Sequence, residues 1–230
     1  MKYFAFLIVL QVILMASCSE SSAQRTQRFG INTGLNLSKM KLAGPGVNES
    51  YTKTHAGIYL GVSGEFFLSN SISFETGLGF SNKGYNYEGP VRFTFVTYNG
   101  KFKTNLLYLD IPMSFKAYFP MKTESSKFYL LFGPYMGIGV SGKHKLEVKD
   151  SRGVTLYDKI PVEWGSSNTS GGEYKRFDFG WTLGTGFEFG AVQLGINYAI
   201  GSSNIAVGSN DEAKNRTFAF VLVYKFNKES

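Results

Sequence analysis

The sequence predicts an all-β fold, a closed antiparallel up-and-down transmembrane β-barrel of about eight strands with short periplasmic turns and long outer loops. Two independent patterns predict it. Apolar and polar residues alternate along eight segments, and the connections between these segments are alternately long and short. The composition agrees, because 27 glycines and 16% aromatic residues, with only 18% charged residues, suit twisted strands better than helices.

The N-terminus has the pattern of a cleavable signal peptide over residues 1–23. A lysine at position 2 precedes an almost continuous apolar run over 4–15, which is too short to span a membrane as a helix. Small residues then lead to Ala23, so that cleavage would leave Gln24 as the new N-terminus. Residues 24–230 are therefore predicted to form one barrel domain. In a competing interpretation, a lipobox-like pattern makes Cys18 a lipidated N-terminus.

Strict alternation is clearest over 176–189, where the apolar face is interrupted only by Thr185. Its bulky residues are Phe177, Phe179, Trp181, Leu183, Phe187 and Phe189, and its other face carries glycine, threonine and charged residues. The eight predicted strands are 28–39, 55–68, 71–85, 106–119, 127–142, 176–189, 191–201 and 217–226. Each places small or polar residues opposite its bulky apolar ones, which is the pattern of a sheet with two different environments.

The connections divide into two classes. Those over 40–54, 86–105, 143–175 and 202–215 are long, whereas those at 69–70, 120–126 and Gly190 are short. Membrane barrels of bacteria have short periplasmic turns and long outer loops, so the alternation places every long connection outside. The long connections have room for hairpins, and Phe93, Phe95 and the Asn99–Gly100 pair suggest one beyond the membrane.

The bulky face is predicted to point into lipid. Eight strands supply on the order of 40 bulky side chains, whereas the packed interior of an eight-stranded parallel barrel holds only about 12. Tyr59, Tyr129 and Tyr135 then join small residues in a narrow lumen. Aromatic residues should collect at the two membrane interfaces. The predicted periplasmic set is Phe66, Phe74, Phe119, Phe128, Phe189 and Phe226, and the outer set is Phe80, Tyr108, Phe177, Tyr198 and Phe218.

Charged residues on the inward face are predicted to form a structural network that plugs the lumen, because a charge in a narrow lumen must be paired or hydrated. The periplasmic half should hold Glu65, Glu75, Lys116, Glu188 and Lys225, and the outer half Lys83, Asp110, Arg176 and Asp178. The alternative for the same residues is a gated polar pore.

No catalytic, cofactor-binding or metal-binding residue is predicted. The two histidines, His55 and His144, have no serine or carboxylate two residues away on their own strand, and they are interpreted as ordinary rim residues. Without a mature cysteine a transition-metal site is not expected. The net charge of +7 comes from scattered lysines and arginines, so a nucleic-acid partner is not predicted. The simplest interpretation is that these charges keep the loops solvated, and the more specific alternative is that they attract anionic lipid headgroups.

Four short motifs resemble the PorT-like family of small outer-membrane β-barrel domains. They are Gly34-Leu35-Asn36-Leu37-Ser38, Phe74-Glu75-Thr76-Gly77-Leu78-Gly79-Phe80-Ser81, Tyr108-Leu109-Asp110-Ile111-Pro112 with Lys116, and Tyr224-Lys225-Phe226. The resemblance covers roughly residues 28–226 and implies architecture more than activity. One branch of the family is implicated in assembling a protein-secretion system, and no motif here assigns the chain to that branch.

Together these observations predict an integral protein of the cell outer membrane that is not an enzyme and has a structural, adhesive or accessory role. Its expected partners are outer-membrane lipids and other envelope proteins, the latter through the long outer loops, especially 143–175. Three alternatives are a narrow channel for small solutes, a lipid-modifying barrel enzyme and a soluble secreted ligand carrier. The carrier would need Phe179 and Phe220 packed in its centre.

Overall fold

The computed structural model of the chain describes residues 27–44, 49–93, 96–122, 126–149, 155–165, 172–208 and 211–226. The predicted signal peptide over 1–23, with Cys18 and the proposed cleavage between Ala23 and Gln24, lies outside the described residues. None of the described residues belongs to a helix long and apolar enough to cross a bilayer.

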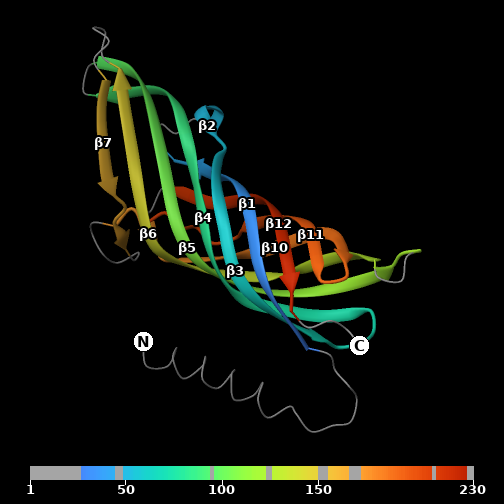
Figure 1. Cartoon of the computed structure of the whole chain (residues 1–230). Helices are drawn as coiled ribbons and strands as arrows, with labels where there is room; N and C mark the ends of the chain where they lie inside the picture. The colour runs from blue at the N-terminus through green and yellow to red at the C-terminus, as the bar shows by residue number, and fades with distance from the viewer. Residues whose placement is uncertain are drawn as a thin grey trace.

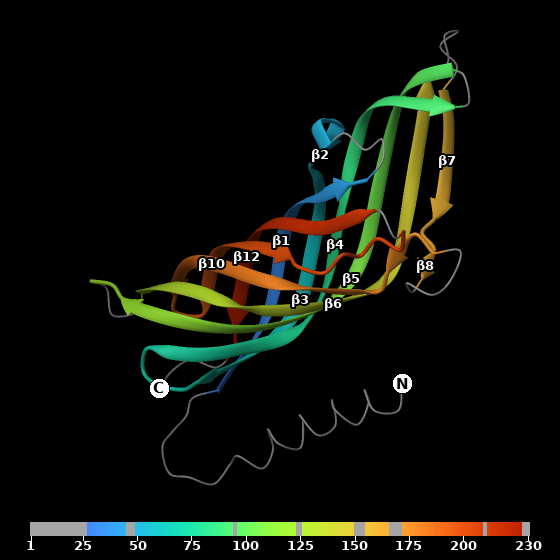
Figure 2. The ribbon, with the colours of Figure 1, turned by 180° about the vertical axis from the view of Figure 1, so that it is seen from behind.

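Eight antiparallel strands form a closed barrel (Figures 1 and 2). They are β1 (Gln27–Ala43), β3 (His55–Phe67), β4 (Ile72–Phe93), β5 (Val96–Pro120), β6 (Ser126–Lys149), β10 (Phe177–Phe189), β11 (Val192–Gly201) and β12 (Glu212–Lys225). Each pairs with its neighbours in chain order, β12 pairs with β1, and β10 pairs with both β6 and β11. The predicted fold is therefore confirmed, and closure satisfies the backbone groups that hydrocarbon cannot solvate.

Five short elements lie at the outer end. They are η1 (Glu49–Tyr51), β2 (Thr52–Lys53), β7 (Thr155–Pro161), β8 (Trp164–Gly165) and β9 (Tyr174–Lys175). β2 pairs with β4, β7 extends the sheet beyond β6, and β8 and β9 form a separate parallel pair. The opposite end has only short connections, as predicted, and the one between β10 and β11 has Gly190 at a positive φ of 59°. Glycine adopts that backbone conformation without steric cost.

Bulky apolar side chains cover the outside of the barrel. Phe179 and Phe220 are 48% and 49% exposed, so neither lies in the centre. The same face carries, among others, Phe29, Ile58, Leu60, Phe80, Phe115, Phe132, Trp181, Leu183 and Tyr224. A continuous apolar belt of this extent is suited to lipid and not to water, which argues against the soluble-carrier alternative.

The lumen is filled where tyrosine rings lie against inward glycines. A Cβ atom at Gly79 would lie 2.5 Å from the ring of Tyr59, and one at Gly180 would lie 2.6 Å from the ring of Tyr135. The hydroxyl of Tyr129 approaches Gly186 in the same way. The small residues of the inward face are therefore required by close packing, which explains why glycine alternates with aromatic residues along these strands.

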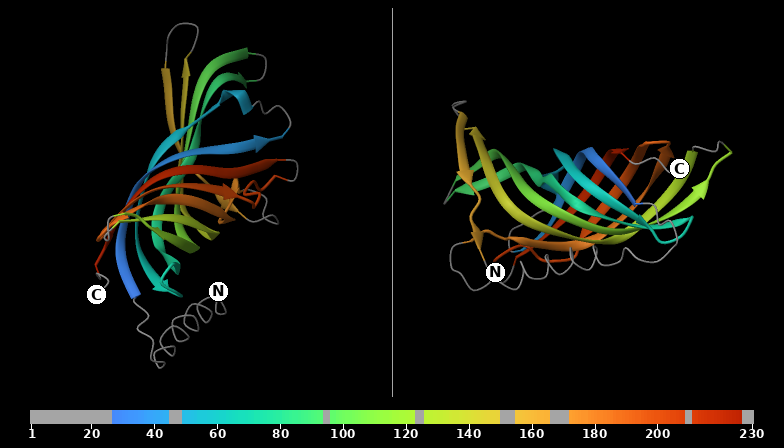
Figure 3. Two further views of the ribbon diagram at one scale, coloured as in Figure 1. Left: turned by 90° about the vertical axis from the view of Figure 1, so that its right-hand side faces the viewer. Right: turned by 60° about the horizontal axis from the view of Figure 1, so that its bottom comes forward.

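Strands β4, β5 and β6 continue past the barrel at the outer end and, with β7 paired to β6, form a raised sheet, here called the blade (Figure 3). It comprises residues 84–93 of β4, 96–106 of β5, 143–149 of β6 and 155–161 of β7. The suggested hairpin exists, but Asn99 and Gly100 lie inside β5, opposite Pro90 and Gly89, and do not form its turn. The strands pair as far as Phe93 with Val96, and Phe95 lies outside the described residues.

A β-bulge separates the barrel from the blade. Leu107 pairs with Ser141 and Tyr108 with Gly139, so Val140 is an extra residue in β6. The bulge reverses which residues of β6 face outward: odd-numbered residues face the lumen below it, whereas His144 is buried and Lys145 is exposed above it. On β5 the residue Tyr108 is completely buried, so its predicted place in the lipid-facing outer aromatic set is wrong. Tyr108 has the parity of Asp110, which also faces the lumen.

Candidate functional site

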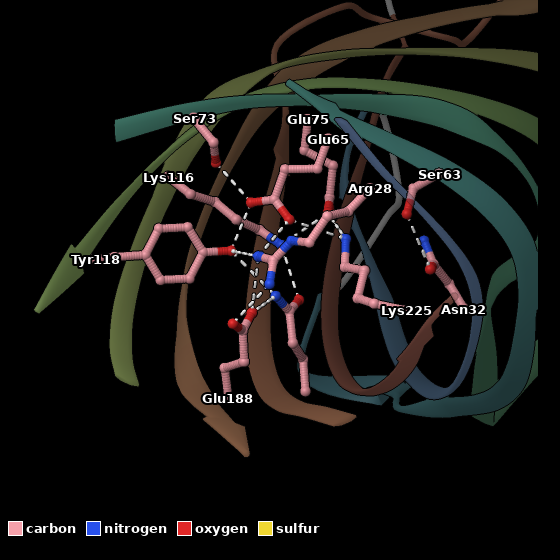
Figure 4. Close-up of polar contacts among 11 residues, drawn as sticks. Arg28, Asn32, Ser63, Glu65, Ser73, Glu75, Lys116, Tyr118, Glu188 and Lys225 are labelled. Carbon is pink, nitrogen blue, oxygen red and sulfur yellow. Dashed lines mark hydrogen bonds and ion pairs between the residues drawn. The ribbon is translucent and has the colours of Figure 1, made fainter. Parts of the chain in front are cut away.

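Six charged side chains meet in the periplasmic half of the lumen and form what we call the lower cluster (Figure 4). Three are cationic and three anionic: Arg28, Lys116 and Lys225 with Glu65, Glu75 and Glu188. All six residues are buried. Five of them are the residues predicted for this half, and the sixth is Arg28.

Arg28 is the residue that the sequence analysis missed. Its guanidinium donates to Glu188 at 2.8 and 3.0 Å and to Glu65 at 2.9 Å. These partners lie 160 and 37 residues further along the chain, so Arg28 links β1 to β10 and β3. It also lies over the ring of Phe67, 4.7 Å from the centroid. Arg28 shares the inward parity of Gly30, Asn32 and Gly34, so the same alternation that identified the other charges could have found it.

Two like charges face each other at the centre of the lower cluster. Glu65 and Glu75 are directly paired across β3 and β4, an arrangement that is unfavourable without counter-ions. The ammonium of Lys225 lies 2.7 Å from Glu75 and 3.2 Å from Glu65, and that of Lys116 lies 2.7 Å from Glu75. Each carboxylate therefore has a cation within contact distance, which a narrow lumen requires.

Neutral side chains complete the lower cluster. Ser73 and Tyr118 donate to Glu65, and Gln193 donates to Glu188 while accepting from Lys116 at 3.0 Å. The ammonium of Lys116 also lies 4.9 Å from the ring centroid of Tyr129 on β6. Every strand of the barrel thus contributes a side chain, so the lower cluster ties the whole circumference together.

A second group, the upper cluster, lies in the outer half of the lumen. It consists of Lys83, Asp110 and Asp178, with Lys83 2.9 Å from Asp110 and 3.6 Å from Asp178. One cation thus serves two carboxylates. Asp178 also accepts hydrogen bonds from three neutral donors, Asn215 at 2.8 Å and Tyr135 and Ser203 at 3.1 Å.

Arg176 does not belong to either cluster, and its predicted place in the lumen is wrong. It lies in the bend just before β10, which begins at Phe177, so strand parity does not govern its direction. Its side chain is exposed and donates to the carbonyl of Gly139 at 3.1 Å, and its guanidinium lies 6.0 Å from the ring centroid of Trp164. The other eight predicted residues all line the lumen.

A cavity of about 120 Å³ separates the two clusters. Its polar lining includes Asn32, Tyr59, Ser114 and Asn197, together with Glu75 and Lys116 below and Lys83 and Asp110 above. A space of this size lined by these polar groups can hold several water molecules, which would solvate the facing sides of the two clusters.

The outer mouth of the barrel is covered by a cap, formed by residues 162–165 and 172–175 with the segment 202–208. Ile205 is completely buried and packs with Val162 and Tyr174 against Leu106 and Tyr108 of β5. Backbone bonds join the two parts of the cap, since Lys175 donates to the carbonyl of Ile205 at 2.7 Å. The described residues therefore close the mouth with an apolar layer.

His144 joins the cap to the base of the blade. Its ring lies 3.0 Å from the hydroxyl of Thr104 and 2.8 Å from a carboxylate oxygen of Glu173, so it is not the simple rim residue that the sequence suggested. Both His144 and Thr104 are buried, whereas the Glu173 side chain is 47% exposed. A hydroxyl, an imidazole and a carboxylate are the groups of a hydrolytic triad, but this hydroxyl has no exposed surface at which a substrate could approach.

The sequence of this chain matches the model of one protein family. Residues 16–204 match a family described as outer membrane protein beta-barrel domain. No curated protein matches the chain in sequence.

Several solved structures resemble the chain. Neisserial surface protein A is 12% identical, with 86% of this chain and 97% of that chain covered at a TM-score of 0.39. The outer membrane protein OprG from Pseudomonas aeruginosa is 13% identical, with 88% and 97% covered at a TM-score of 0.45. Ail, the attachment invasion locus protein of Yersinia pestis, is 15% identical, with 86% and 98% covered at a TM-score of 0.35.

Proposed function

Because the chain belongs to the outer membrane protein β-barrel domain family, and its barrel is filled and capped, we propose that it serves as a non-catalytic anchor for a docking surface. The anchor is the barrel, and the docking surface is the blade. The role is structural, adhesive or accessory to another envelope component, in line with the resemblance to PorT-like domains. The observation that carries this proposal is the contrast between a closed lumen and the four-stranded blade beyond it.

The inner face of the blade has the chemistry of a protein-binding surface. Tyr87, Phe102 and Leu146 lie side by side in register on β4, β5 and β6, each only partly buried. Ile160 of β7 is 43% exposed on the same face. A row of half-exposed aromatic and aliphatic side chains, supported from below by the cap, is the kind of patch that a partner protein covers.

Conductance across a planar bilayer tests the closed-lumen part of the proposal. Purified barrel should produce no openings, because both clusters and the cap obstruct the path, whereas a water-filled porin in the same bilayer provides the positive control. Regular openings from the unmodified protein would favour the narrow-channel alternative and end this part of the proposal.

Site-specific crosslinking tests the docking part. A photoreactive residue in place of Leu146 should crosslink to a discrete envelope protein in intact cells, and one in place of Lys41, on the exposed rim of β1, should not. Crosslinking to lipid alone from position 146, or equal products from both positions, would contradict a docking role for the inner face of the blade.

An enzymatic alternative rests on Thr104, His144 and Glu173. We assign these residues to the attachment of the cap, because the Thr104 hydroxyl is completely buried. Mass spectrometry of outer-membrane lipids from cells that carry the protein, a Thr104→Val variant or no protein separates the two assignments. Identical lipids in all three support attachment, and a lipid change that only the unmodified protein produces would support an enzyme.

A further inference from the structure

The outer face of the blade carries four lysines close together: Lys103, Lys143, Lys145 and Lys159, which we call the basic face. Lys145 pairs directly with Lys103 on β5 and with Lys159 on β7, so three ammonium groups project from adjacent strands in one row. All four residues are exposed. Side chains that are directly opposite across strands have Cβ atoms about 5 Å apart, and like charges at that separation repel.

The fold provides counter-charges for other lysines at this end of the protein. Lys101 lies 3.2 Å from Glu88, and Lys214 and Lys41 lie 3.1 and 3.6 Å from Glu212. Within the described part of the chain, none of the four lysines of the basic face has an ion-pair partner. The basic face therefore has a local excess of positive charge, which a bound anion would neutralise.

These lysines surround a hollow of about 440 Å³. Its remaining polar lining is neutral and consists of Asn82, Asn105, Ser141 and His55. Burial and the nearby ammonium of Lys103 lower the pKa of His55, and its Nε2 has no hydrogen-bond partner among the described residues. Ammonium groups together with amide, hydroxyl and imidazole groups suit a phosphate carried on a hydroxyl-rich molecule.

The hollow lies immediately above the lipid-facing belt. Leu107 closes its lower side, and Phe80 on β4 and Val140 on β6 are 52% and 47% exposed just below it. Asn82 is two residues above Phe80 on the same face of β4. A ligand in this position would place its polar part against the lysines and any acyl chain against the apolar belt.

The β-bulge is the feature that creates this surface. Without the extra residue Val140, Lys143 and Lys145 would keep the inward parity of Tyr135 and Gly137 and would face the lumen. The register shift turns both lysines outward, in line with Lys103 and Lys159. Bulges commonly redirect side chains at binding surfaces in this way.

From this convergence we propose that the basic face binds the phosphorylated sugar headgroup of an outer-leaflet lipid, whose acyl chains lie against the apolar belt below. The binding would hold the blade at a fixed height over the membrane and leave its inner face free. This site is separate from the docking surface proposed above, so either can fail while the other holds.

Native mass spectrometry of the folded barrel in zwitterionic micelles, titrated with diphosphoryl lipid A, tests the proposal. The variant Lys103→Gln/Lys145→Gln/Lys159→Gln should bind at least about tenfold more weakly than the unmodified protein, because three charge contacts are lost. Lipid A without phosphates should bind the unmodified protein as weakly as diphosphoryl lipid A binds the variant. Heat-dependent gel mobility verifies that each variant is folded.

The matched control is Lys39→Gln/Lys41→Gln/Lys214→Gln, which removes the same charge from the outer ends of β1 and β12. It should bind diphosphoryl lipid A like the unmodified protein. Equal losses of lipid A affinity in the two triple variants would show only general electrostatic attraction and would contradict a specific site on the basic face. Competition by an equal concentration of inorganic phosphate would overturn the choice of a lipid as ligand.

The thermal unfolding temperature gives a second test, because the lysines should lower it in the absence of lipid and raise it in the presence of lipid. In lipid-free micelles the basic-face variant should unfold at or above the temperature of the unmodified protein, because repulsion between the lysines is relieved. Addition of diphosphoryl lipid A should raise the unfolding temperature of the unmodified protein alone. A variant that is less stable in both conditions would mean that the lysines support the fold itself, contrary to the proposal.

Discussion

The two charge clusters fill the same lumen with different chemistry. The lower cluster balances three cations against three carboxylates and takes a side chain from every strand of the barrel. The upper cluster shares one cation between two carboxylates and depends on neutral donors, one of which, Ser203, belongs to the cap. The periplasmic half is therefore stabilised by the barrel alone, whereas the outer half is stabilised jointly by barrel and cap.

The largest effect is expected where a charge contacts two partners. Replacement of Arg28 by Met leaves Glu65 and Glu188 without their guanidinium, and removing one partner of a buried ion pair costs about 3–5 kcal/mol. Urea unfolding in micelles, followed by gel mobility, measures this change. Lys41→Met, which removes an exposed ion pair, is the control, and equal shifts for the two variants would remove the distinction between buried and exposed pairs.

A slightly smaller effect is expected for Glu75→Ala. Lys116 and Lys225 then lose their closest carboxylate, but Lys225 keeps Glu65 at 3.2 Å, so we expect a loss of about 2–4 kcal/mol and a lower unfolding temperature. The double variant Glu75→Gln/Lys116→Gln should lose less stability than the sum of the losses in Glu75→Gln and Lys116→Gln, because it also removes one of the charges that each single variant leaves unpaired. Strict additivity would contradict direct coupling.

The upper cluster should tolerate loss of its cation better than the lower cluster. Lys83→Met leaves two carboxylates, but Asp178 retains three neutral donors, so we expect about 1–3 kcal/mol. Hydrogen exchange should increase mainly in the cap segment 202–208, which contacts Asp178 through Ser203. A global loss as large as that of Arg28→Met would show that the two halves are equally dependent on their ion pairs.

The smallest effect is expected for the attachment of the cap. Glu173→Gln weakens the contact with His144, and because the carboxylate is 47% exposed we expect less than about 1 kcal/mol. Exchange of the backbone amides in 172–175 should become faster while the barrel strands remain protected. Faster exchange throughout β6 would mean that the contact also supports the barrel wall.

Local pattern was sufficient to predict the strands and their lipid-facing sides. Successive side chains of a strand point to opposite faces, so the sequence of each segment shows which of its faces is apolar. Phe179 and Phe220 face outward, as this pattern predicts. The same parity identified eight inward charges. It failed at Arg176, which precedes its strand, and it made no prediction for the blade, where an extra residue reverses the parity.

Alternation and connection length are local properties of the chain, so a membrane barrel with polar residues inside could be predicted without any knowledge of its contacts. The three-dimensional arrangement of the strands sets which charges meet, because Arg28 and Glu188 are 160 residues apart and contact through the stagger of strands around a closed ring. It also decided that the cap closes the mouth and that Val140 turns two lysines outward. Those outcomes depend on the register between strands, which cannot be read from the sequence of any single strand.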